Sequence, residues 1–273
     1  MTNEVMQELA DGYATECGAL YALLAPLTDA AWDHPTQFKQ WTLNDILAHL
    51  AFFDACALLA LRDEAALVEL FSQLRAAVTA GTPSMAFAHK WLGNAKGAAL
   101  LARWHSQSLQ LAQEHSQADP KRRIKWAGPD MSVRSSLSAR LMETWAHAQA
   151  IYDQLGRTRV EGDYLRNVVE LGINTYKWTF LNRKLPVPEP QPFVRLTAPS
   201  GAVWEWGSDG TSERIEGSAS EFCQVVAQTR NVADTSLRVE GENARKWMAI
   251  AQCFAGVGRD PPPAGTRFRQ HAA

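Results

Sequence analysis

Three side chains in the N-terminal half of the sequence are of types that bind metal ions. Glu143 and His147 are four residues apart, so on a helix they lie one turn apart on the same face. His49 belongs to the apolar segment 41–50, which predicts a separate helix. If these helices face each other, two imidazoles and one carboxylate hold a divalent cation and leave coordination positions open. Open positions are typical of metal centres that do chemistry, whereas a structural zinc site is closed by four protein ligands.

Ordinary structural roles compete with a metal site for these residues. A single histidine on an apolar helix face is more often a hydrogen-bonded core residue than a ligand. A buried carboxylate needs a cationic partner, and Arg140, three residues before Glu143, is a candidate for that role. A surface pair of Glu143 and His147 is a third alternative. The spacing alone therefore leaves both the metal site and an ion pair open.

Asp45 lies one turn before His49 and is a candidate ligand or hydrogen-bond acceptor for a ligand. Capping already accounts for it, because Thr42 is a good N-cap and Asp45 follows three residues later. The other histidines share no spacing, and we expect them to be solvated surface residues: His34, His89, His105, His115 and His271.

The candidate ligands need a helical scaffold, and the periodicity of apolar residues in the first part of the chain predicts one. The segment 124–131, with Trp126 and a Gly-Pro break, is predicted to be a loop. Ser132 is predicted to cap the helix that carries Glu143, and Gly156 to end it. Helices are predicted over 4–24, 43–63, 64–78, 96–116, 133–155 and 163–183.

The composition changes near residue 185. Segment 185–191 alternates proline with other residues, which predicts an extended linker. Alternating apolar residues then predict a hairpin and a small α+β domain, with strands over 193–197, 202–206, 212–216 and 237–240 and helices over 219–228 and 242–254. We therefore predict an α+β multidomain chain: a helical bundle over 1–184, the linker 185–191, an α+β domain over 192–258 and a disordered tail over 259–273.

Composition excludes several classes of protein. The chain has 27 Lys and Arg against 29 Asp and Glu, with no long basic run, so we expect no nucleic-acid partner. The longest apolar stretch, 46–61, is too short to span a bilayer, and the N-terminus lacks a secretory signal, so we expect a cytoplasmic protein with no membrane partner. The 4 cysteines show no paired spacing and are predicted to be reduced core residues.

Four groups of residues resemble one known family. They are 41–50, 126–129, 140–147, and 197–201 with 204–207. The sequence resembles an uncharacterised metal-binding family related to mycothiol-dependent maleylpyruvate isomerase, within the DinB-like superfamily. The resemblance covers nearly the whole chain, with the motifs in order.

The resemblance implies an N-terminal DinB-like four-helix bundle whose metal ligands are His49, Glu143 and His147. It also implies a C-terminal α+β domain similar to the sterol-carrier-like domain of that isomerase. The ion implied is Zn²⁺ or another divalent metal such as Ni²⁺ or Fe²⁺. Members of known activity use the ion to bind and activate a low-molecular-weight thiol.

Our leading hypothesis is a zinc-dependent enzyme that presents a thiol such as mycothiol, as thiolate, to a small electrophilic substrate. Thiol transfer, or isomerisation through reversible thiol addition, would follow. Trp126 and Trp178 are candidates for the pocket wall, and Arg183 is a candidate contact for an anionic group of substrate or thiol. A homodimer is compatible with the sequence.

Other functions remain open at this point. Hydrolysis by metal-bound water, whose pKa falls to about 7, ranks second among the enzymes. A non-catalytic metal or small-ligand sensor is the rival class, and a bundle held by an ion pair without metal is the third alternative.

Overall fold

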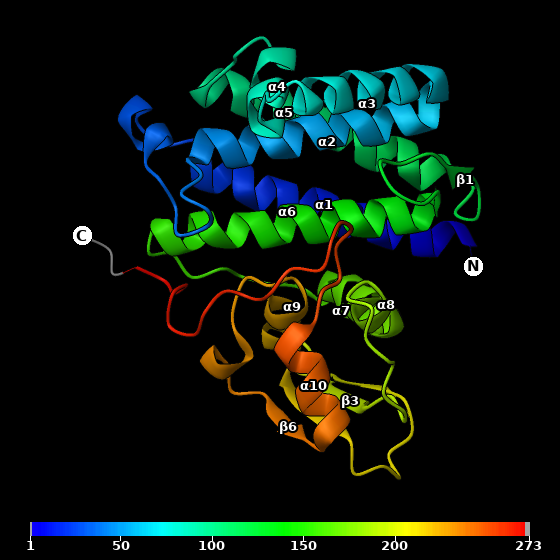
Figure 1. Cartoon of the computed structure of the whole chain (residues 1–273). Helices are drawn as coiled ribbons and strands as arrows, with labels where there is room; N and C mark the ends of the chain where they lie inside the picture. Colours follow the sequence, from blue (N-terminus) through cyan, green and yellow to red (C-terminus); the bar gives the residue numbers. More distant parts are fainter. Residues whose placement is uncertain (1, 271–273) are drawn as a thin grey trace. The chain divides into compact units, whose positions relative to one another are not determined.

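The computed structural model describes residues 2–270 and divides into two compact units, Met1–Ala148 and Gln149–Ala273 (Figure 1). His271, one of the histidines expected at the surface, lies outside the described residues.

The N-terminal unit is a helical bundle. Helix α5 packs against both α1 and α2, and α6 is joined to α2 by the hydrogen bond between Arg140 and Asp54. Helix α6 begins in this unit and its last turns belong to the next. The elements are α1 (Thr2–Leu24), the 3-10 helix η1 (Asp29–Asp33), α2 (Leu43–Arg62), α3 (Glu64–Thr79), α4 (Ser84–Trp91), α5 (Gly97–Gln117), β1 (Arg123–Ile124), β2 (Met131–Ser132) and α6 (Val133–Gln154).

The predicted start of α2 is confirmed. The backbone N–H of Asp45 donates to Thr42 Oγ1 at 3.1 Å, and that of Thr42 donates to Asp45 Oδ2 at 2.9 Å, so the two residues form a capping box. This cap places His49 two turns inside the helix. Helix α2 is long and apolar enough to cross a membrane by length and composition, but 78% of its apolar window is buried, as is typical of a core helix.

Two local elements of this unit differ from the prediction. Segment 84–91 forms the short helix α4, which is too short for its periodicity to stand out in the sequence. The segment predicted as a loop contains an antiparallel ladder in which Ile124 pairs with Met131, so Trp126 lies in a hairpin connection. The predicted cap of α6 is confirmed, because Ser132 Oγ accepts a hydrogen bond from the backbone N–H of Ser135 at 3.0 Å.

The C-terminal unit contains the predicted sheet, with strand order β4-β3-β5-β6. The hairpin is confirmed, with Leu196 of β3 opposite Trp204 of β4, and β5 pairs in parallel with β3. The strands are β3 (Phe193–Thr197), β4 (Val203–Trp206), β5 (Arg214–Ser218) and β6 (Arg238–Glu240). The helices are η2 (Asp163–Leu165), α7 (Arg166–Asn174), α8 (Tyr176–Leu181), α9 (Ala219–Val226), η3 (Val232–Asp234) and α10 (Glu242–Ile250).

The boundary between the two compact units follows Ala148, whereas the proline-rich segment predicted a bundle that extends to residue 184. The helix predicted over 163–183 is broken at Thr175 into α7 and α8, and both pack in the C-terminal unit. Gly172 of α7 lies so close to α9 that a Cβ there would meet Val226 Cγ2 at 2.9 Å. The ring of Tyr176 meets that of Trp247 edge to face, with centroids 5.0 Å apart. These residues therefore belong with the sheet and not with a bundle that ends at residue 184.

The tail, predicted to be disordered from residue 259, is held by hydrogen bonds through residue 270. The backbone N–H of Arg259 donates to Gln252 Oε1, and that of Gln270 donates to the carbonyl of Asp153, each at 2.9 Å. Arg267 Nη1 donates to the carbonyl of Gln228 at 2.7 Å. The polar composition and the prolines of this segment predicted disorder. That prediction is wrong because the hydrogen-bond partners that hold the tail are remote in sequence and cannot be recognised from composition.

The histidines expected at the surface fall into different environments. His34 is exposed, as predicted. His105 stacks on Tyr21 with ring centroids 4.2 Å apart. His89 is not simply solvated, because its Nε2 lies 2.8 Å from Asp45 Oδ1. Asp45 therefore caps α2 and pairs with α4, which gives it a structural role.

The predicted surface position is wrong for His115, which is 0% exposed. Its Nδ1 donates to the carbonyl of Leu111 at 3.0 Å, and within the described residues its Nε2 has no hydrogen-bond partner. Burial lowers the pKa of His115 to about 4, although the Leu111 carbonyl and Glu114 act in the opposite direction.

This histidine should make stability depend on pH. In the unfolded chain its pKa is about 6.5, so between about pH 6.5 and 4 the unfolded state binds the additional proton. The free energy of unfolding should then fall as the pH drops through that window, by about 2–3 kcal/mol from this group. His115→Gln should lose less stability than wild type between pH 7 and pH 4.5 in urea titrations, whereas exposed His34→Gln should behave as wild type. Equal losses in all three proteins would exclude His115 as the source.

Candidate metal centre

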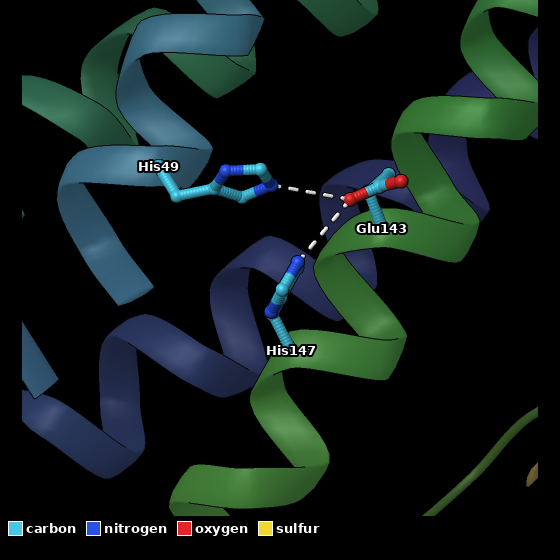
Figure 2. A group of neighbouring side chains, drawn as sticks. All are labelled: His49, Glu143 and His147. Atoms are coloured by element: carbon cyan, nitrogen blue, oxygen red, sulfur yellow. Dashed lines mark hydrogen bonds and ion pairs between the residues drawn. The ribbon is translucent and has the colours of Figure 1, made fainter. Parts of the chain in front are cut away.

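His49, Glu143 and His147 converge on one point of the bundle (Figure 2). His49 comes from α2, and the other two side chains come from successive turns of α6. Glu143 Oε2 lies 3.2 Å from His49 Nε2 and 3.3 Å from His147 Nε2. One potential ligand atom from each residue lies within 4.8 Å of the other two. The structure thus brings together the three residues that the sequence singled out.

The three side chains are half-buried, and the pKa values of His49 and Glu143 favour the forms that bind a cation. Their exposed fractions are 18% for His49, 25% for Glu143 and 11% for His147. Burial lowers the pKa of His49 to about 4, with the charge of His147 acting in the same direction, so His49 is neutral at pH 7. Burial alone would raise the pKa of Glu143, but hydrogen bonds from His147 and His49 outweigh it and hold that pKa well below its ordinary value. A carboxylate and a neutral imidazole are the forms that bind metal.

The structure does not pair Glu143 with Arg140. The guanidinium of Arg140 turns to α2 instead, where its Nε donates to Asp54 Oδ1 at 2.8 Å. The second oxygen of Asp54 accepts a hydrogen bond from Trp104 Nε1 at 2.9 Å. Asp54 and Arg140 are 0% and 3% exposed, so they form a buried pair of their own. Among the described residues, the hydrogen-bond partners of Glu143 Oε2 are therefore the two histidines.

Aromatic rings form one side of the centre. The ring of Trp41 stacks on that of His147 with centroids 5.8 Å apart and an interplanar angle of 12°. Phe38 meets the same histidine edge to face at 5.0 Å, and Phe53 lies 4.8 Å from the ring of His49. These rings restrict the rotation of both imidazoles and lower the local dielectric constant around the ligand atoms.

The segment before α2 positions two of these rings. It closes through a bond from the backbone N–H of Thr36 to the Trp41 carbonyl at 2.8 Å. Within the turn, Lys39 and Gln40 have positive φ values of 52° and 59°, a conformation that non-glycine residues rarely adopt. No glycine marks this turn in the sequence, so Phe38 was not singled out there, and neither was Phe53 within its apolar run.

The donor set fits a divalent transition metal. Ligand atoms of a tetrahedral zinc ion lie about 2.0–2.2 Å from the metal and therefore about 3.3–3.6 Å from one another. The separations of 3.2 and 3.3 Å between Glu143 Oε2 and the two imidazole nitrogens are close to that spacing. Imidazole and carboxylate donors suit Zn²⁺, Ni²⁺ and Fe²⁺ alike. The two imidazoles and the carboxylate thus fit a divalent transition-metal ion.

The residues predicted to line a pocket are distributed over both units. Trp126 lies in the N-terminal unit, where its ring is 6.2 Å from that of Phe53, the aromatic neighbour of His49. Trp178, 37% exposed, and Arg183 belong to the C-terminal unit. Arg183 Nη1 donates to the carbonyl of Thr179 at 3.3 Å, and its Nη2 donates to that of Arg259. Arg183 thus has backbone partners within its own unit, and its contact with an anion stays a prediction, as does the role of Trp178.

Fold and site together define a class: a helical bundle with a two-histidine, one-glutamate cluster, followed by an α+β unit. The family model of the mycothiol maleylpyruvate isomerase N-terminal domain matches residues 13–152, which include all three residues of the cluster. The chain belongs to this family, and the resemblance predicted from the sequence is confirmed.

Comparison with known proteins found relatives along most of the chain. Uncharacterised proteins of two Mycobacterium tuberculosis strains, CDC 1551 / Oshkosh and ATCC 25618 / H37Rv, are each 37% identical over 250 residues, 92% of this chain and 95% of the relative. Among solved structures, the mycothiol-dependent maleylpyruvate isomerase matches with a TM-score of 0.48 at 17% identity, over 84% of this chain and 90% of that chain. A histidine-to-alanine mutant of that enzyme matches with a TM-score of 0.49 at 18% identity and the same coverage.

Proposed function

We propose that this protein binds a divalent metal, Zn²⁺ foremost, through His49, Glu143 and His147, and uses it to activate a low-molecular-weight thiol in a transferase or isomerase reaction. The observation that carries the proposal is the meeting of two imidazole nitrogens on one carboxylate oxygen within a half-buried, aromatic-lined site. Membership of a family named for a mycothiol-dependent isomerase supports a thiol as cosubstrate, with mycothiol as the first candidate.

Each residue has a distinct part in this proposal. Glu143 supplies one negative charge, so a centre holding a divalent cation keeps a net positive charge that favours an anionic sulfur. His49 stays neutral at pH 7 and does not repel the cation. Trp41 and Phe38 hold His147 in place and exclude water from one side of the site.

A cation bound there stabilises a thiol in its deprotonated, nucleophilic form. Three protein ligands leave room for that sulfur. The buried cysteines are not required, because burial raises the pKa of Cys17, Cys56 and Cys223 and keeps them as thiols.

We also infer a cytoplasmic location without nucleic-acid or membrane partners, which is supported by the balanced charge and by the burial of α2.

The test has two stages. Protein loaded with Co²⁺ in place of zinc is first titrated with mycothiol, glutathione and bacillithiol, because a cobalt–thiolate bond adds a strong near-ultraviolet absorption. Zinc-loaded protein is then incubated with the bound thiol and small electrophiles, including cis-configured unsaturated acids. Net loss of thiol indicates transfer, whereas cis–trans conversion without thiol loss indicates isomerisation.

We expect one thiol to give a saturable absorption change and turnover, and both signals to be lost in Glu143→Gln. A thiol that binds without turnover of any electrophile would favour a binding or sensing protein. Metal binding with no response to any thiol would contradict the proposed chemistry, and absence of metal binding would contradict the site itself.

A further inference from the structure

A groove of about 370 Å³ lies on the N-terminal unit between α2, α4 and α5, which Figure 1 shows close together. One wall is an apolar stripe of α2 formed by Ala55, Leu58 and Leu59. These residues follow helical spacing, so they line one face of α2. The volume lies at the lower end of the range for small-ligand sites and is too small for a protein helix.

The lining residues that come from α5 are polar. Arg103, Gln107 and Gln110 line the groove, again at helical spacing. Trp91, at the end of α4, also lines the groove, and the guanidinium of Arg103 lies 5.8 Å from the centroid of its ring. Trp91 is 36% exposed, so its ring is partly accessible to solvent. The groove therefore combines a flat ring, an aliphatic wall and hydrogen-bonding side chains.

The charge of the groove is positive. Arg103 Nη1 donates to the neutral carbonyl of Leu92 at 3.0 Å, and in the part of the chain that the structure describes no carboxylate pairs with this guanidinium. Arg62, also in the lining, is compensated, because its Nε donates to Glu114 Oε2 at 2.7 Å. Among the described residues that line the groove, none is acidic. Arg103 thus keeps its full charge and unused N–H donors beside an apolar wall.

This groove is separate from the metal centre. Leu58 follows His49 by about two and a half helical turns and so lies on the opposite side of α2. The ligand atoms of the metal centre lie between α2 and α6, whereas the groove uses α4 and α5. A molecule in the groove therefore does not compete directly for the metal.

We propose that this groove is a second binding site, for a small organic anion with an apolar body, such as an aryl sulfonate or a medium-chain carboxylate. The acidic group pairs with Arg103, and the apolar body lies between Trp91 and the α2 stripe. The proposal is independent of the thiol chemistry at the metal centre.

The probe is 8-anilinonaphthalene-1-sulfonate, added to the full-length protein and followed by its fluorescence. We expect saturable binding that octanoate displaces and octanol does not, because octanol has the apolar chain without the charge. Arg103→Gln should weaken probe binding by about 10-fold or more. Arg75→Gln, which removes an exposed arginine of α3, changes the net charge equally and should leave binding within about 2-fold.

Several outcomes would overturn the assignment. Equal weakening in both arginine variants would mean general attraction to a positive surface. Unchanged binding in Arg103→Gln, equal displacement by octanol, or a signal that does not saturate would each exclude a defined anion site in this groove. Loss of binding in Glu143→Gln would place the probe at the metal centre instead. The octanoate and octanol comparison uses wild-type protein, so it decides the question even if a variant fails to fold.

Discussion

Replacing Glu143 with glutamine should weaken zinc binding by at least about 100-fold while leaving the fold intact. Glutamine keeps the shape of the side chain but removes the negative charge of the cluster, and a neutral amide oxygen is a poor zinc ligand. Glutamine has nearly the same volume as glutamate, and Glu143 is 25% exposed, so the substitution should open no cavity and bury no unpaired group. Zinc content by elemental analysis and chelator competition measure the effect, with circular dichroism as the check on folding.

The matched control is Glu69→Gln, which changes an exposed carboxylate on α3. Zinc affinity should stay at the wild-type value in that variant. Undiminished zinc binding in Glu143→Gln would mean that Glu143 is not a zinc ligand and would contradict the proposed centre.

Much of this site was predictable because local rules place its residues. The Thr42 and Asp45 capping box determines where α2 begins and so where His49 falls along it. The four-residue spacing of Glu143 and His147 places both on one face of α6. That α2 faces α6 at the level of His49 is a property of the bundle, which spacing cannot specify; the resemblance to a known family supplied it.

Other features depended on tertiary contacts that the sequence does not reveal. Arg140 is at helical spacing from Glu143, and the choice of Asp54 as its partner depends on how α2 packs against α6. The break between α7 and α8 falls at Thr175, whose hydroxyl donates to the carbonyl of Leu171 at 2.8 Å, and no proline or glycine marks that position. The burial of His115 and the ordering of the tail have the same origin. Periodicity predicts which face of a helix is apolar but not which neighbour covers it.

Asp54→Asn should lower the free energy of unfolding by about 3–5 kcal/mol. Asparagine preserves the volume of Asp54 and still accepts a hydrogen bond, so the variant mainly removes the charge that compensates Arg140. At 3% exposure the guanidinium cannot be solvated by water in place of that charge. Urea unfolding followed by tryptophan fluorescence measures the loss. Glu114→Gln is the control, because it breaks the exposed pair that α2 makes through Arg62 and should cost less than about 1 kcal/mol.

The double variant Asp54→Leu with Arg140→Met separates the pair's contribution to stability from its contribution to the site. Replacing both charges with apolar side chains of similar volume should recover part of the stability, because no buried charge is left unpaired. Recovery is incomplete because the buried Trp104 Nε1 loses its acceptor. Asp54 and Arg140 join the two helices that carry the candidate ligands, so the pair also sets how α2 lies against α6. Zinc affinity should therefore stay weakened in the double variant even where stability returns. Full recovery of both stability and zinc affinity in the double variant would mean that the pair only stabilises the fold. In the single variant Asp54→Asn, a loss below about 1 kcal/mol would mean that Arg140 finds another partner when the charge of Asp54 is removed.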